Sequence, residues 1–202
     1  MPWRVFGETL VTFVVILDPI GSVPFFLALT EGRTPRERHR AAYLAVLAAA
    51  GVLAAFAAFG QALLAYLSIS LESLMVAGGL LLLLVAAEML RGGDPAAAAP
   101  EDASLALVPL GTPWLAGPGA IVQTVLAMRR HEELPERLAV AGGIALALGL
   151  VLLALRLATL VARLIRPSAI HFVTRIMGLL LTAIAVQLIV DAVARWLERG
   201  LA

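Results

Sequence analysis

The sequence predicts an all-α polytopic membrane protein with six transmembrane helices in two inverted-topology three-helix repeats, helices 1 and 4 being broken. Three observations lead to this fold class. Of the 202 residues, 61% are hydrophobic and 14% charged, and the mean hydropathy is +0.97, which exceeds that of soluble domains. Several apolar runs approach or exceed the ~20 residues that cross a bilayer as a helix. The two halves also share a pattern of prolines and glycines.

The predicted spans follow one another along the chain, separated by charged or turn-rich connections. They cover residues 5–29, 41–67, 71–90, 105–128, 138–162 and 171–194. The connections at 31–40 and 129–137 are charged hinges, whereas RGGDPAAAAPEDAS at 91–104 has the composition of a linker. We therefore predict a single membrane domain made of a first repeat at 1–92, a linker at 93–104 and a second repeat at 105–202.

Internal similarity supports the division into halves. Pro19 and Pro24 recur as Pro113 and Pro118, 94 positions later, and each pair lies in an apolar span. The segment GLLLLLVAAEML at 79–90 matches GLLLTAIAVQLI at 178–189, 99 positions later. Three spans per half is an odd number, so the second half must enter the membrane from the opposite side, which predicts an inverted-topology repeat.

The proline pairs predict where the first and fourth helices break. Proline has no N–H to donate to the carbonyl four residues earlier, and it is well suited to the first position of a helix. Pro24 and Pro118 are therefore expected to begin half-helices whose positive N-terminal ends suit a carboxylate. Asp18 and the freed carbonyls would suit an ammonium group or a coupling cation. A zwitterionic amino acid fits both ends.

A purely structural interpretation remains open for each of these residues. Prolines often only kink a membrane helix, and Asp18 before Pro19 is also a good helix cap. Arg175 is expected either to face Asp18 or Glu88 as a counter-ion or to extend to the membrane interface. The glycines expected to serve close helix packing are Gly78, Gly79, Gly142, Gly143 and Gly178. Other polar residues that would line a path or bond their own helices are Ser22, Thr112, Gln123, Thr124, Thr174 and Gln187.

Several function classes find no support in the sequence. The net charge of +1 argues against nucleic-acid binding. The chain has no cysteine, hence no thiol nucleophile or thiolate metal site, and it contains no H-E-x-x-H, G-x-S-x-G or P-loop motif. We therefore expect no enzymatic activity, no metal and no cofactor beyond a coupling proton or sodium ion.

Four segments resemble a known family. LDPIGSVPFFLAL (17–29), PWLAGPGAI (113–121) and TRIMGLLLTAIAVQLIVDA (174–192) are similar to signature segments of the MarC family of bacterial inner-membrane proteins, and VAGGLLLLLVAAEML (76–90) is consistent with its third span. The resemblance covers nearly the whole chain. It implies a six-helix protein of the lysine-exporter-like superfamily, similar to cation-coupled transporters of glycine, alanine and related neutral amino acids.

On that resemblance, the segments 18–21 and 117–119 form paired substrate-binding breaks and Arg175 is a polar partner. Ser22, where many members have asparagine, and Trp114, where a smaller residue is expected, depart from the family pattern. The residues expected to bind substrate or ion are Asp18, Pro19, Gly21, Ser22, Pro24, Thr112, Pro113, Gly117, Pro118, Gly119 and Arg175.

The leading hypothesis is a secondary transporter of small neutral amino acids or similar zwitterions, working by alternating access between the inverted halves. A channel or passive pore, and a membrane scaffold that transports nothing, are the alternatives. The expected partners are a small-molecule substrate and the lipid bilayer, and small-residue helix faces suit either a homodimer or internal packing. The protein is expected in the bacterial inner membrane, with both termini outside because the first loop is rich in arginine.

Overall fold

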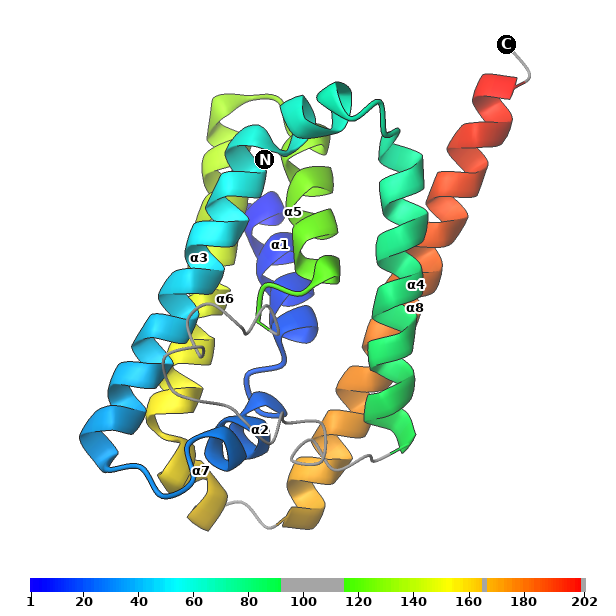
Figure 1. The fold of residues 1–202 in the computed structure, drawn as a ribbon. Helices are drawn as coiled ribbons and strands as arrows, with labels where there is room; N and C mark the ends of the chain where they lie inside the picture. The colour runs from blue at the N-terminus through cyan, green and yellow to red at the C-terminus, as the bar shows by residue number, and fades with distance from the viewer. Residues whose placement is uncertain (92–114, 165–166, 201–202) are drawn as a thin grey trace.

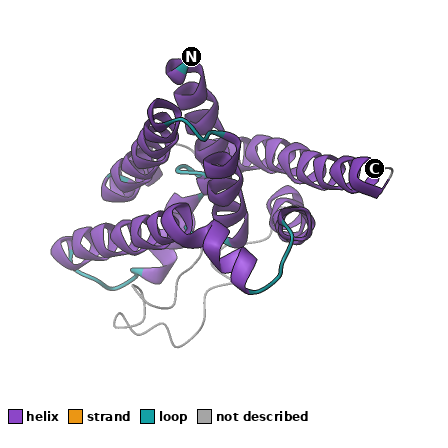
Figure 2. Cartoon of the chain, turned by 90° about the horizontal axis from the view of Figure 1, so that it is seen from above, coloured by secondary structure: helices purple, strands orange, loops and turns teal. Residues whose placement is uncertain are grey.

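The computed structural model describes residues 1–91, 115–164 and 167–200, and every regular element within them is a helix (Figures 1 and 2). The all-α prediction is therefore confirmed for these residues. The helices are α1 (Pro2–Leu17), α2 (Ser22–Leu29), α3 (Pro35–Tyr66), α4 (Leu71–Arg91), α5 (Pro118–Arg130), α6 (Leu134–Arg156), α7 (Ala158–Leu164) and α8 (Pro167–Gly200).

Four described helices are long and apolar enough to cross a membrane: α3, α4, α6 and residues 168–198 of α8. The pair α1 and α2, bent by 47° at the break between them, makes a fifth candidate if taken as one span. The helix break that the prolines predict in the first span is therefore present, and the bent pair is either one broken span or a re-entrant segment. The predicted fourth span is represented by α5, because residues 105–114 and the predicted linker at 93–104 lie outside the described residues.

The third helix, α3, begins earlier than its apolar run. Thr34 and Glu37 form a capping box, in which the Thr34 hydroxyl accepts from the Glu37 N–H at 3.3 Å and a Glu37 carboxylate oxygen accepts from the Thr34 N–H at 2.9 Å. Pro35 occupies the first turn, where its missing N–H costs nothing. Part of the predicted charged hinge at 31–40 is therefore the start of α3.

The fifth span ends earlier than predicted. α6 stops at Arg156, and Leu157 separates it from the short helix α7, whereas the apolar run suggests one span over 138–162. The Arg156 side chain is exposed at the end of α6, where a cation interacts favourably with the carbonyl end of the helix. Arg156 therefore lies at a helix end and not within a span.

The helices pack around two hydrophobic clusters. One is formed by α1, α2, α3, α6 and the first residue of α7, and the other mainly by α4, α5 and α8. Within these, α1 lies along α6, and α4 lies along α8. α5 takes part in both clusters, through Ala120 in the first and through Val125 and Leu126 in the second. Figure 1 shows both chain ends at the same side of the bundle.

Two glycines bring α4 and α8 into close contact. A Cβ atom at Gly79 would lie 2.7 Å from Cγ1 of Ile189 and 2.9 Å from the carbonyl oxygen of Ala185. A Cβ atom at Gly178 would lie 3.3 Å from the carbonyl oxygen of Ala86. A Cβ atom at position 79 would require the backbone of α8 to shift, and one at position 178 would fit only if its neighbours on α4 gave way by a few tenths of an ångström, so both glycines allow close packing. The predicted packing role of both glycines is confirmed.

We expect Gly79→Leu to lower the free energy of unfolding by about 1–3 kcal/mol, because the added side chain must push α8 away. The measurement is the unfolding midpoint of the purified protein in detergent. Gly51→Leu is the matched control, since Gly51 is an exposed helical glycine with no atom within 4 Å of its added Cβ. Equal midpoints for the two variants would show that the α4–α8 contact is not tight.

Candidate functional site

The first break separates α1 from α2 at Asp18. Asp18 follows the last residue of α1 and adopts a left-handed conformation, with φ 37° and ψ 76°, which aspartate tolerates better than most residues. Its N–H still donates to the carbonyl of Val14, at 3.1 Å. Pro19 then has no N–H to continue the ladder. The chain turns and begins α2 at Ser22.

The carboxylate of Asp18 faces the start of α2. It is buried, with 8% of the residue exposed, and its Oδ1 accepts a hydrogen bond from the N–H of Gly21, at 3.0 Å. A Cβ atom on Gly21 would overlap Oδ2 of Asp18 and lie 2.8 Å from its Cγ. Only glycine at position 21 therefore lets the carboxylate lie over the beginning of α2.

The Ser22 side chain forms hydrogen bonds with carbonyl groups at the break. Its hydroxyl donates to the carbonyl of Asp18 at 2.7 Å and to that of Leu17 at 3.1 Å, and the side chain is buried. The carbonyl of Ile20, which lies four residues before Pro24 and cannot accept from it, accepts from the N–H of Val23 at 3.1 Å. The break is thus largely satisfied by local bonds, and the Asp18 carboxylate is its one charged group.

The second predicted break falls at the start of α5, and the residues before 115 lie outside the described part of the chain. Gly117 is the extended cap residue and Pro118 occupies the first turn, as predicted. Pro24, in contrast, is the third residue of α2, so the prediction that it begins that half-helix is wrong by two residues: the bonds of Ser22 start the helix earlier. Figure 1 shows α5 beginning midway through the bundle. Its first N–H groups have no acceptor within the helix.

Gly119 fits the start of α5 against α4. It is buried, and a Cβ atom there would overlap the side chain of Leu82. The predicted site residues Thr112 and Pro113, together with Trp114, lie outside the described residues.

Arg175 is not brought to Asp18. It is exposed on α8, and within the described ranges it forms no ion pair with Asp18 or with Glu88, which is exposed on α4. Thr124, proposed for a polar path, is buried and donates to the carbonyl of Ala120 in its own helix at 2.7 Å. Nowhere in the described part of the chain do three acidic or histidine side chains gather as metal ligands would.

A polar cavity lies between α1 and α5, and the sequence analysis did not predict it. Of its polar lining residues, only Gln123 was expected to line a polar path. Its volume is about 140 Å³. The signal was present as polar residues at helical spacing near the start of α1. The polar residues that line it are Glu8, Thr9, Thr12, Gln123, Arg130 and His131.

Charged pairs join helices at this end of the bundle. Arg130 of α5 pairs with Asp191 of α8 at 2.9 Å, and Asp191 also accepts from Gln187 at 2.6 Å. His131 Nδ1 lies 2.9 Å from a carboxylate oxygen of Glu136 on α6. The cavity therefore lies beside a polar network that joins α5, α6 and α8.

Comparison with known proteins gives a consistent result along the whole chain. A family model described as "MarC family integral membrane protein" matches residues 3–197. The UPF0056 membrane protein MJ1677 of Methanocaldococcus jannaschii is 42% identical over 185 residues, covering 88% of this chain and 90% of that protein. YvbG of Bacillus subtilis is 31% identical over 188 residues, with 89% of each chain covered.

A third relative carries a location in its name. The UPF0056 inner membrane protein YhgN of Escherichia coli strain K12 is 27% identical over 190 residues, covering 93% of this chain and 95% of that protein. No solved structure matches this chain.

The capping bond of Asp18 can be separated from its charge. We expect Asp18→Ala to lower the free energy of unfolding by about 1–3 kcal/mol, because the N–H of Gly21 loses its acceptor and alanine tolerates the left-handed backbone less well than aspartate. Asp18→Asn keeps an oxygen acceptor and tolerates the left-handed backbone, so it should unfold within about 0.5 kcal/mol of wild type. Thermal unfolding in detergent measures both, and an asparagine variant as unstable as the alanine variant would contradict the capping role.

Proposed function

We propose that this chain, which belongs to the MarC family of integral membrane proteins, is a secondary transporter of small neutral amino acids or similar small zwitterions. Transport would be coupled to a proton or sodium gradient across the bacterial inner membrane. The observation that carries the proposal is the break between α1 and α2 at Asp18, together with the start of α5 at Gly117 and Pro118, where the sequence predicts the second break. Irregular backbone at membrane depth persists where it is enclosed in protein or lines a cavity.

The two breaks offer opposite charges to a zwitterion. The N-terminal end of α5 carries unpaired N–H groups and a partial positive charge, which suits the substrate carboxylate. The buried Asp18 carboxylate, whose described partner is the N–H of Gly21, suits the substrate ammonium group or the coupling cation. Ser22 is committed to the carbonyls of Leu17 and Asp18, so it shapes the break.

Reciprocal contacts support an inverted repeat. Gly79 of α4 faces the carbonyl of Ala185, and Gly178 of α8 faces the carbonyl of Ala86. The repeat offset of 99 positions relates Gly79 to Gly178 and Ala86 to Ala185. Each contact therefore joins a glycine of one repeat to the equivalent alanine of the other repeat. Such an exchange is what a two-fold relation between antiparallel helices produces. We place the pseudo-two-fold axis between α4 and α8.

The direction of α1 and α6 agrees with spans that cross the membrane in turn, which an inverted repeat requires. The amino group of Met1 lies 4.0 Å from a Glu136 carboxylate oxygen, and an added Cβ on Gly143 would lie 3.0 Å from the carbonyl oxygen of Phe6. The two helices therefore run parallel. In an inverted repeat of three spans, the first and fifth spans cross in the same direction. Rocking of one half against the other would then expose the breaks to each side in turn.

Uptake by proteoliposomes tests the proposal. Purified protein is reconstituted with labelled alanine or glycine outside and an imposed proton or sodium gradient. We expect wild type to accumulate substrate against its gradient, and Asp18→Asn to lose accumulation by roughly tenfold or more, because one buried charge interaction is removed. Gly119→Leu should act similarly by displacing α5 from Leu82, whereas Gly51→Leu is the matched control.

The outcomes separate the function classes. Flux that does not saturate and never accumulates would indicate a channel. Absence of flux in folded, correctly inserted wild type would overturn the neutral amino-acid proposal and favour another substrate or a scaffold. Accumulation unchanged in Asp18→Asn would remove Asp18 from the mechanism.

A further inference from the structure

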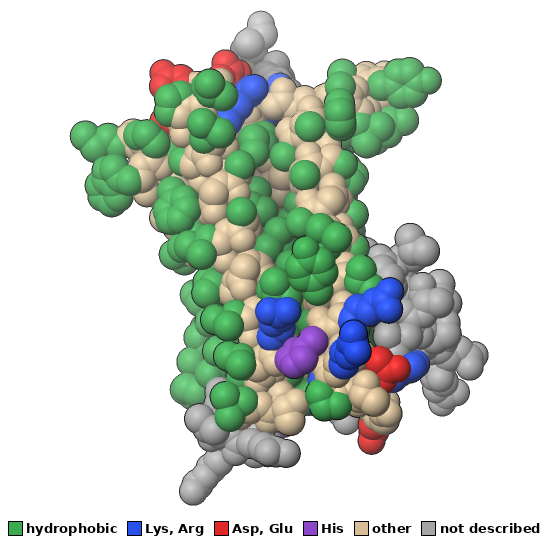
Figure 3. Space-filling view, turned by 90° about the vertical axis from the view of Figure 1, so that its left-hand side faces the viewer, with side chains coloured by type: hydrophobic (Ala, Val, Ile, Leu, Met, Phe, Trp, Pro, Cys, Tyr) green, Lys and Arg blue, Asp and Glu red, His purple; other side chains and the backbone are tan. Residues whose placement is uncertain are grey.

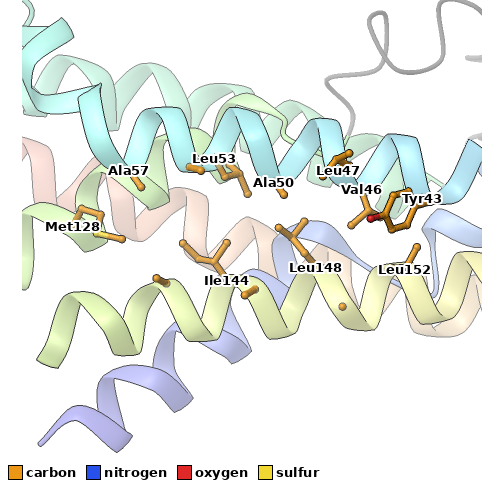
Figure 4. Close-up of a pocket in the computed structure, with 14 residues that line it drawn as sticks. Tyr43, Val46, Leu47, Ala50, Leu53, Ala57, Met128, Ile144, Leu148 and Leu152 are labelled. Carbon is orange, nitrogen blue, oxygen red and sulfur yellow. The ribbon is translucent and has the colours of Figure 1, made fainter.

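A groove between α3 and α6 lies apart from the proposed transport site. Its volume is about 430 Å³, and its lining, drawn in Figure 4, includes the exposed residues Tyr43, Leu47 and Ala145. Leu47 and Leu53 of α3 face Ile144 and Leu148 of α6 across it. The lining is almost entirely apolar, and small residues such as Ala50 leave the space between the helices unfilled.

One end of the groove is marked by Tyr43, which is 53% exposed. Figure 4 shows Tyr43 beside Leu152 at that end. Tyrosine is enriched where a membrane protein crosses from hydrocarbon to lipid headgroups, since its ring is apolar and its hydroxyl polar. Tyr43 is therefore suited to headgroup depth, and the apolar lining beyond it is suited to hydrocarbon.

Basic residues continue the same helix faces beyond Tyr43. Arg36, Arg40, Tyr43 and Leu47 are spaced by four, three and four positions, which places them along one face of α3. Arg156 follows Leu152 by one turn on the antiparallel helix α6, so it extends toward the same end. Figure 3 shows several basic side chains and a histidine gathered at one end of this face, with a few acidic side chains beside them, and a largely apolar band between this end and the charged opposite end.

The arginines of this cluster form no ion pair within the described part of the chain. Arg36, Arg40 and Arg156 are exposed, and none is among the ion pairs of the described residues. Glu37, the acid in the first turn of α3, is held by the N–H and hydroxyl of Thr34. Arg38 differs from its neighbours, because it donates to the carbonyl of Thr30 and the hydroxyl of Thr159.

We propose that this groove binds an anionic phospholipid. One acyl chain lies between α3 and α6, and the phosphate lies among Arg36, Arg40 and Arg156. Basic clusters beside membrane helices attract anionic headgroups, and an apolar groove next to one adds selectivity for a complete lipid. A second copy of the chain fits less well, since a two-fold axis through the groove along the membrane normal would bring two arginine clusters together.

Native mass spectrometry tests the headgroup part. The protein is taken from nanodiscs of mixed phosphatidylcholine and phosphatidylglycerol into detergent, and the retained lipids are counted. We expect phosphatidylglycerol to be retained preferentially, and R36Q/R40Q to reduce its occupancy by roughly tenfold. R36K/R40K, which keeps both charges, should retain most of it. R4Q/R129Q is the matched control, since both residues are exposed at the opposite end of the bundle.

Two alanines test the groove itself. Ala54 lines the groove and Ala55 does not, although both are exposed on α3. A54F should displace the lipid, whereas A55F should leave its occupancy unchanged, with the helix content of both variants verified by circular dichroism.

Three results would overturn the lipid site. The first is equal retention of both lipids by wild type. The second is equal loss in R36Q/R40Q and R4Q/R129Q. The third is a dimer that A54F dissociates while the bound lipid stays, which would assign the groove to a second copy.

Discussion

The described fold depends on one constraint: the backbone groups released at the Asp18 break must be paired inside a membrane-embedded bundle. An unpaired amide or carbonyl costs several kcal/mol in hydrocarbon. Local hydrogen bonds pair these groups in the structure. The Asp18 carboxylate accepts from the N–H of Gly21, and the Ser22 hydroxyl donates to the carbonyls of Leu17 and Asp18. Packing of α2 against α6 and α7 then encloses the turn. A chemically useful carboxylate is thus also part of what allows the chain to bend.

Much of the fold follows from local signals in the sequence. The break before α2 and the start of α5 are set by Pro19 and Pro118, whose geometry is fixed by the ring. The ends of the helices were harder to predict from the sequence, because they depend on hydrogen bonds between specific side-chain and backbone groups. α3 starts inside a charged segment through the Thr34 capping box, and α6 ends at Arg156 within an apolar run. Hydropathy alone predicts neither the start of α3 nor the end of α6.

The candidate site was predictable where its residues are neighbours along the chain. Asp18, Gly21 and Ser22 interact as one turn, so their spacing is informative. Arg175 is different, because which face of α8 points inward is decided by its packing on α4. The polar cavity between α1 and α5 likewise joins residues more than a hundred positions apart. Tertiary packing brings residues so far apart in sequence together, and a local sequence pattern does not predict it.

The double membership of α5 in the two hydrophobic clusters has a consequence for leakage. Ala120 packs in one cluster, whereas Val125 and Leu126 pack in the other. A rearrangement that moved one cluster relative to the other would have to break apolar contacts on one face of α5. This helix therefore couples the two clusters, and in the proposed transporter it would limit how far they can separate and admit water between them.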